Sequence, residues 1–487
     1  MLPIEVFLAV MYFTFGVSGW SPEASPAPLS CLLWTLLSLG LFGAASEAAT
    51  FLLRRWREAG AWQVDDGRAV REQAGFYLRI LLFACFIIQM EWFGWPGMAG
   101  AALGTGNWRS LEALIGLLPF LAMLILLWHA FYAIEDAATR GRWSRMGYVG
   151  FRTRYNFYVL IPWLALMAAM DLCGNYLPGD WQSWFSGGGW GEAVLSIASL
   201  IAAGAIFPPI LLRLWRCRPL PDGQLKERLC GLQAKAGVRF SGFYVWRIGG
   251  GILNAAALGL LPRFRYLLIS ESLLDRLTED EICGVVGHEL GHLRHRHLLF
   301  YLIFIFGFAA AASYMHYAEV FGGRLESALG ICLLFAIYLR FGFGYVSRRF
   351  ERQADLFGLE LLGRAEPLVA SLEKIAIITG SPRQKPCWHH ASIAVRVSFL
   401  RAAEDDPRLG SQHHAEVARL KLGMTAIACG IFWFAAFGEG ADRMRQDTPA
   451  AYSRTDWINH WRGLEALLPG DPEPANRLRK LLAEVKE

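Results

Sequence analysis

Two histidines in this sequence have the spacing to bind one metal ion. His288 and His292 open and close the pentapeptide His-Glu-Leu-Gly-His, and residues four apart lie on one face of an α-helix. Glu289 follows the first histidine, where its carboxylate could take a proton from a water held by that metal. Such a pentapeptide arises by chance in about one chain in a hundred of this length, so the interpretation needs a third metal ligand.

A second pair of side chains could supply that ligand. Glu351 and Asp355 lie one helical turn apart. Catalytic zinc commonly takes two histidines and one glutamate and leaves a fourth position for water. Glu351 could be this glutamate, and Asp355 could orient a ligand histidine. The simpler alternative is an ordinary charged helix at the end of a membrane span.

The elements around these residues can be predicted from local patterns. Thr278 and Glu281 fit a capping box at the start of the helix that carries His288. Apolar residues follow at the spacing of one helix face, which would pack on a core: Ile282, Val285, Val286, Leu290 and Leu293. A helix over 224–237 and short strands over 240–248, 252–258 and 265–269 precede it, so 215–297 reads as a small α+β unit. An edge strand of this unit could bind an extended peptide.

Composition indicates a membrane protein. The 487 residues are 54% hydrophobic, with 19 Trp, and the mean hydropathy is +0.32. The net charge of +5 is modest and shows no clustering of the kind that binds nucleic acid. The Cys residues are dispersed, without a Cys-x-x-Cys pair, which argues against a disulfide framework or a cysteine zinc site.

Nine apolar stretches are long enough to cross a bilayer at about 20 residues each. They lie near 3–20, 29–50, 75–95, 111–134, 156–172, 192–214, 298–318, 326–346 and 421–438. Arginines cluster between the second and third stretches and between the fourth and fifth, whereas the loops 96–110 and 173–191 hold only Arg109. The positive-inside rule then makes the arginine-rich loops cytoplasmic. Counting the predicted spans from these loops places both 215–297 and 347–420 on the cytoplasmic side. Glu351 therefore returns to the membrane face that holds His288.

The fold class predicted is a mainly α-helical polytopic membrane protein with a small α+β zinc metalloprotease domain of the gluzincin kind. Its predicted parts are N-terminal transmembrane helices in 1–214, a catalytic α+β segment in 215–297, a transmembrane hairpin in 298–346, a second catalytic segment in 347–420, a candidate last span in 421–438 and a C-terminal tail in 439–487.

Over about 215–400 the chain resembles the integral-membrane zinc metalloproteases that include the CaaX prenyl protease and the bacterial protease HtpX. The resemblance rests on Asn254-Ala255, on His-Glu-Leu-Gly-His, on the run Ser-Arg-Arg-Phe-Glu-Arg-Gln-Ala-Asp over 347–355, and on His-Ala-Ser-Ile-Ala-Val-Arg over 390–396.

The resemblance implies a role for each matched residue. One zinc ion per chain would be bound by His288, His292 and Glu351, with Glu289 as the general base. The remaining matched residues would serve the substrate or support the ligands. Asn254 and Ala255, with their strand, would align the substrate backbone, and His390 and Arg396 would stabilise the oxyanion and brace the site. Asp355, His297 and Arg348 would surround the ligands.

We therefore predict a membrane-embedded zinc endopeptidase that cuts protein or peptide substrates, lipidated ones among the candidates, at the cytoplasmic side of a lipid membrane. One alternative is a protease of the site-two type, which cuts within transmembrane helices. Another is a transporter or scaffold with a relic metal site. His295 and the pair His413-His414 match no motif and are predicted to lie on the solvated surface.

Overall fold

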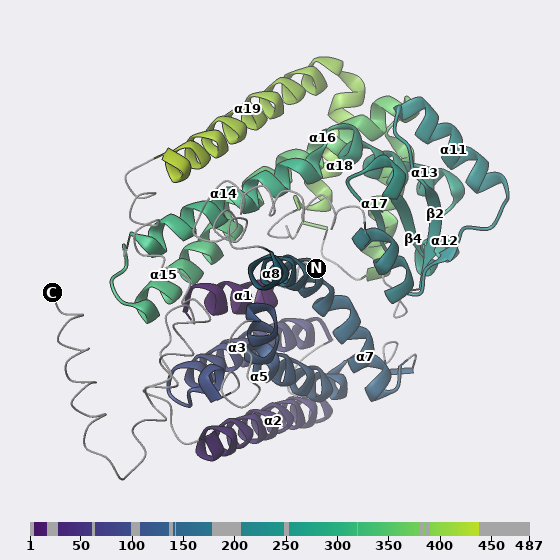
Figure 1. Cartoon of the computed structure of the whole chain (residues 1–487). Helices are drawn as coiled ribbons and strands as arrows, with labels where there is room; N and C mark the ends of the chain where they lie inside the picture. The colour runs from purple at the N-terminus through teal and green to yellow at the C-terminus, as the bar shows by residue number, and fades with distance from the viewer. Residues whose placement is uncertain are drawn as a thin grey trace, which may run out of the picture.

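The computed structural model describes residues 4–16, 28–60, 64–98, 108–135, 140–141, 143–177, 206–247, 253–318, 320–379, 383–384 and 390–437. N-terminal helices form one side of the molecule, and the sheet with its flanking helices forms another (Figure 1). The small α+β unit predicted among many helices is present, so the predicted fold class is confirmed.

The apolar helices of the N-terminal part pack around a common core. They are α1 (Ile4–Gly16), α2 (Pro28–Glu58), α3 (Val64–Glu91), α5 (Arg109–Phe131), α7 (Arg145–Asn156) and α8 (Leu160–Tyr176). Large buried side chains such as Phe86, Phe120 and Met123 fill the space between them. Outward-facing Leu33, Leu37 and similar residues are exposed on α2, as expected for a helix whose solvent is lipid.

Five helical stretches of the described chain are long and apolar enough to cross a membrane. They are Pro28–Glu58, Val70–Glu91, Arg109–Ile134, His297–His316 and Leu325–Leu362, and the bent pair Arg145–Asn156 with Leu160–Tyr176 would make a sixth. Of the other predicted spans, the first is a shorter apolar helix, Glu5–Thr14, and 192–214 lies mostly outside the described residues. The last predicted stretch forms the end of helix α19 (Pro407–Phe437), which is not among the five.

A four-stranded sheet lies beside the helix that carries the histidines. Its order is β1 (Arg218–Pro219), β2 (Gly242–Trp246), β4 (Tyr266–Ser270) and β3 (Ala255–Leu258). β2 pairs parallel with β4, while β3 pairs antiparallel with β4 and forms one edge. The three strands predicted from sequence are therefore present. β2 and β3 are shorter than predicted and β4 is shifted by one residue, while α11 (Gln224–Ala236) matches the predicted helix. The predicted glycine turn at 249–251 lies outside the described residues.

Helix α13 (Glu279–Arg294) begins with the predicted capping box. The amide of Glu281 donates to Thr278 Oγ1 at 3.3 Å, and the amide of Thr278 donates to the Glu281 carboxylate at 2.7 Å. α13 packs on α16 (Gly344–Leu362) and α17 (Glu366–Thr379), with α12 (Glu271–Arg276) before it.

Glycines let α13 approach its neighbours closely. A Cβ placed on Gly291 would lie 2.8 Å from the Cα of Ala354 in α16, and one on Gly284 would lie 2.6 Å from the backbone of Leu368 in α17. Both positions lack the room for a side chain, so the short helix–helix distance depends on glycine. This distance allows side chains from α16 to reach those of α13.

After α13 the chain leaves the sheet and returns. α14 (His297–Tyr317) and α15 (Arg324–Ile337) form a hairpin, and a π-helical segment (Tyr338–Phe343) joins α15 to α16. α18 (Ile393–Asp405) packs on α16, and α19 packs along α14 and α16 (Figure 1). The hairpin thus lies in sequence between α13 and α16, which are in contact in the structure.

Candidate metal centre

The two histidines of α13 face each other. His288 is buried and His292 is partly buried, and their Nε2 atoms lie 3.1 Å apart. Helical geometry produces this pairing, because the two residues are one turn apart on one face.

Glu351 of α16 brings a carboxylate to the same point. Its Oε1 lies 3.3 Å from His292 Nε2, and its Oε2 lies 3.6 Å from His288 Nε2. Among the residues that the structure describes, these three form the group of metal-ligating side chains whose donor atoms gather within 4.8 Å of one another. Glu351 is 5% exposed, which is rare for a carboxylate without a cation.

The spacing of these donor atoms suits zinc. Four ligands placed tetrahedrally at the usual zinc bond lengths of about 2.0–2.1 Å would lie about 3.3 Å from one another. The three observed separations of 3.1, 3.3 and 3.6 Å scatter around this value. Two imidazoles and a carboxylate are also the donor set of one class of catalytic zinc site. The residues therefore fit the ion that the sequence predicted.

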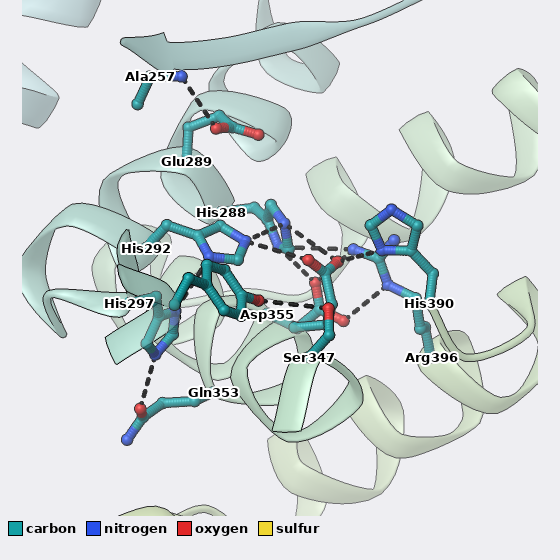
Figure 2. Close-up of polar contacts among 12 residues, drawn as sticks. Ala257, His288, Glu289, His292, His297, Ser347, Gln353, Asp355, His390 and Arg396 are labelled. Atoms are coloured by element: carbon teal, nitrogen blue, oxygen red, sulfur yellow. Dashed lines mark hydrogen bonds and ion pairs between the residues drawn. The ribbon is translucent and has the colours of Figure 1, made fainter. Parts of the chain in front are cut away.

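Asp355 and Arg396 hold His288 from behind (Figure 2). His288 Nδ1 lies 2.7 Å from Asp355 Oδ1, and the guanidinium of Arg396 donates to both oxygens of Asp355, at 2.6 and 2.9 Å. Asp355 is 1% exposed. Because a carboxylate can only accept here, Nδ1 carries the proton and Nε2 presents its lone pair.

A chain of hydrogen bonds also fixes the tautomer of His292. Its Nδ1 lies 2.9 Å from His297 Nδ1, and His297 Nε2 lies 2.9 Å from Gln353 Oε1. That amide oxygen also accepts from Lys421 Nζ at 3.2 Å, which fixes the orientation of the amide. His297 must then donate through Nε2 and accept through Nδ1, so His292 donates through Nδ1. Its Nε2 is again left with a free lone pair.

Glu289 points away from the ligand group and toward the edge strand (Figure 2). Its Oε2 accepts a hydrogen bond of 3.2 Å from the amide of Ala257 in β3. The carbonyl of Asn254 accepts from Ser270 of β4, and strand alternation therefore turns the backbone of Ala255 and Ala257 to the free edge. The predicted substrate strand and the predicted base thus meet at this edge.

The remaining predicted residues lie close by. His390 Nδ1 lies 2.8 Å from Glu351 Oε2, so this histidine reaches the cluster from the segment before α18. Arg348, Glu351 and Arg396 border one small cavity of about 10 Å³. Arg396 reaches the cluster through Asp355, which is the bracing part of its predicted role.

The carboxylates of the centre act on the charge of the ligand histidines. Asp355 is bonded to Arg396, whereas Glu351 lies beside His292. Burial alone would lower the pKa of His292, but its hydrogen bond with Glu351 and the nearby carboxylates raise that pKa above its usual value. The cluster thus favours a bound cation.

Sequence reasoning missed the outer part of the chain of hydrogen bonds. His413, predicted on the surface, is 4% exposed, and that prediction was wrong. His295 and His414 are also partly buried, and their rings lie 5.3 Å apart. Gln353 could have been suspected, because it lies between Glu351 and Asp355 on one helix, but nothing local points to Lys421.

Comparison with known proteins finds similar sequences. The sequence model of peptidase family M48 matches residues 219–485. A Protease HtpX homolog of Desulfatibacillum aliphaticivorans is 29% identical over 213 residues, which cover 39% of this chain and 68% of that protein. Another, of Burkholderia mallei (strain SAVP1), is 26% identical over 260 residues, which cover 50% of this chain and 90% of that protein.

The fold is also similar to a solved structure. The crystal structure of S. mikatae Ste24p superposes with a TM-score of 0.52 and 16% sequence identity, and the match covers 78% of this chain and 100% of that one. The similarity therefore extends beyond the residues around the histidines into the N-terminal helices.

Proposed function

This chain belongs to peptidase family M48 and is an integral-membrane metalloprotease, and we propose that it is a zinc endopeptidase in which Glu289 is the general base. One observation carries the proposal: the Nε2 atoms of His288 and His292 and the carboxylate of Glu351 converge at 3.1–3.6 Å. When bound there, zinc would polarise the scissile carbonyl and lower the pKa of a water molecule.

Glu289 would move the proton. It is the residue next to a ligand histidine, and its carboxylate is held by the amide of Ala257 rather than by the ligand group. From this position it would accept a proton from the attacking water and pass it to the leaving amine. The hydrogen bond with Ala257 would keep the carboxylate oriented between these two steps.

The edge of β3 would bind the substrate. The outward backbone groups of Ala255 and the outward carbonyl of Ala257 would offer an extended peptide a strand to pair with, next to Glu289, which takes the Ala257 amide. Backbone pairing needs little side-chain specificity, which suits unfolded or membrane-associated polypeptides. Asn254 would set the register of this strand through its bonds to Ser270.

His390 would stabilise the developing oxyanion. Its side chain is 42% exposed and its Nδ1 lies beside the Glu351 carboxylate, so it borders the ligand group from the solvent side. A hydrogen-bond donor placed at such a point acts on charge that appears only in the transition state.

We place the catalytic segments on the cytoplasmic side, because arginines concentrate in the loops that share their side. Lipidated peptides belong to the proposed substrate class. Comparing a prenylated peptide with its unmodified form measures whether the lipid contributes to recognition.

The test is cleavage of an unfolded reporter protein by the detergent-purified protein, with zinc content determined. Glu289→Gln should retain about one zinc per chain and lose about 10²–10⁴-fold in rate. Glu279→Gln, the same change ten residues earlier on α13, should cleave normally. A chelator should abolish cleavage and added zinc should restore it. No zinc in the wild-type protein, even after it is added back, would overturn the proposal and favour a scaffold or transporter.

A further inference from the structure

A second cavity lies on the far side of His297 and Gln353 from the metal ligands. It has a volume of about 520 Å³ and opens between the end of α13, α16 and α19. Figure 2 shows Gln353 beyond His297, away from the ligand group. The volume of the cavity falls in the range of about 300–1,000 Å³ typical of small-molecule sites. Its lining residues are Arg294, His295, Gln353, Phe357, Glu360, His414, Ala418 and Lys421.

The lining carries uncompensated positive charge. Within the described parts of the chain, neither Arg294 nor Lys421 forms an ion pair with a carboxylate. The one acidic residue of the lining, Glu360, lies 3.1 Å from His414 Nε2. Lys421 donates to the carbonyl of His295 at 2.7 Å and to Gln353, which leaves one of its three N–H groups available.

The cavity lies at the level where the membrane begins. The span His297–His316 starts three residues after Arg294, and α19 packs along this span. The Lys421 ammonium lies 5.1 Å from the ring centroids of both Phe300 and Phe350. The ammonium therefore lies close enough to both rings for a cation–π interaction.

Exposed apolar side chains follow the cationic residues in sequence on both α14 and α19. Leu298 and Leu299 open α14 and are 37% and 44% exposed, and Leu422 follows Lys421 and is 72% exposed. A cationic cavity bordered by such residues matches a molecule with a negative head and apolar tails. The donor set does not suit a metal, because the cluster of metal-ligating side chains found among the described residues is the one at His288.

We propose that this cavity binds the phosphate group of an anionic phospholipid, with Lys421 and Arg294 as its ligands. Both cations can make charge-assisted hydrogen bonds to phosphate oxygens, and basic pockets between membrane helices are suited to lipid headgroups. The cavity shares Gln353 and Lys421 with the outer end of the hydrogen-bonded chain to His292. Binding of a phosphate there does not require the proposed chemistry at the metal ligands.

The test counts lipids that stay bound to the delipidated full-length protein. Phosphatidylglycerol, phosphatidylcholine and inorganic phosphate are each added in detergent, and bound molecules are counted by native mass spectrometry. The wild-type protein should retain one phosphatidylglycerol at concentrations where phosphatidylcholine is not retained. Arg294→Gln and Lys421→Gln should each weaken this binding at least tenfold. Arg419→Gln, the same change at an exposed position of α19 outside the cavity, should bind as the wild type does.

Each possible result of this experiment either supports or overturns the lipid-binding proposal. Equal retention of the two lipids, or equal loss in Arg419→Gln, would overturn the proposal. Binding of inorganic phosphate that depends on Lys421, with no added affinity from the lipid, would keep the phosphate site and overturn its lipid source. Lys421→Arg keeps the charge and should keep binding. Arg294 is exposed, so Arg294→Gln reports on binding even if Lys421→Gln disturbs folding.

Discussion

Replacing Asp355 by asparagine would test how the protein prepares His288 to bind a metal. The carboxylate has three short contacts: two N–H groups of Arg396 at 2.6 and 2.9 Å and His288 Nδ1 at 2.7 Å. An asparagine has one accepting oxygen, so it cannot satisfy all three. If its oxygen faces His288, that oxygen can also accept from one Arg396 N–H, but its NH₂ group then faces the Nε–H of Arg396. If its NH₂ group faces His288, the histidine must move its proton to Nε2, the atom that faces the other ligands.

The loss of zinc affinity and the loss of stability can be estimated for both arrangements. Loss of a partner that orients a metal ligand typically lowers metal affinity about 10–100-fold, or about 1.4–2.7 kcal/mol. Arg396 would also be left with a buried charge and no ionised partner, and breaking such a pair costs about 3–5 kcal/mol. Asp355→Asn should therefore show both weaker zinc binding and a less stable metal-free protein.

Two measurements separate these effects. Zinc affinity is measured by competition with a chelating indicator, and stability by thermal unfolding of the metal-free protein in detergent. Asp405→Asn, the same change at an exposed position of α18, is the control and should alter neither. A lower melting temperature with wild-type zinc affinity would refute the reasoning, since Asp355 would then support packing without preparing His288.

Three further predictions follow from the surroundings of the site. His297→Ala removes the acceptor that fixes the tautomer of His292, so zinc affinity measured by the same competition should fall about tenfold. Gly291→Ala would place a Cβ 2.8 Å from the α16 backbone and should lower stability by about 1–3 kcal/mol, whereas Gly231→Ala, with open space on α11, should raise it by about 0.5–1 kcal/mol; thermal unfolding compares them. Burial, then the nearby Lys421 charge, lowers the pKa of His295 to about 4. The folded state should therefore lose stability as the pH falls from about 6.5 toward 4. Thermal unfolding at pH 7.5 and pH 5 should show a smaller loss of stability in His295→Gln than in the wild-type protein.

The inner part of the site could be predicted from the sequence because helical spacing determines it. His288 and His292, and likewise Glu351 and Asp355, are four residues apart, and each pair needs only one helix to share a face. Helical spacing alone does not bring the histidine pair and the carboxylate pair together. That prediction also depended on the chain returning to the same face of the membrane. The glycines at 284 and 291 make that meeting close, but their effect depends on the partner backbones, which spacing does not identify.

The outer part could not be predicted because it is made by contacts between distant segments. Lys421 reaches Gln353 across 68 residues, and His414 reaches it across 61. Two adjacent histidines in a polar helix are usually solvated, and His413 is buried here only because α19 folds back onto α16. Span counting was limited in a similar way: the π-helical segment makes α15 and α16 one continuous helical stretch, Leu325–Leu362, which no hydropathy pattern distinguishes from a span followed by a separate helix.

The hairpin α14–α15 also has a consequence for biosynthesis. His292 leaves the ribosome 59 residues before Glu351 and 104 before Arg396, and a membrane hairpin must insert between them. At about 5–20 residues per second, Arg396 is added about 5–20 s after His292. Until Glu351 and Asp355 are added, the nascent chain holds two of the three proposed metal ligands and lacks the carboxylate that would support His288. If Glu351 is the third metal ligand, the protein would stay inactive until the α14–α15 hairpin has been inserted and α16 has been added.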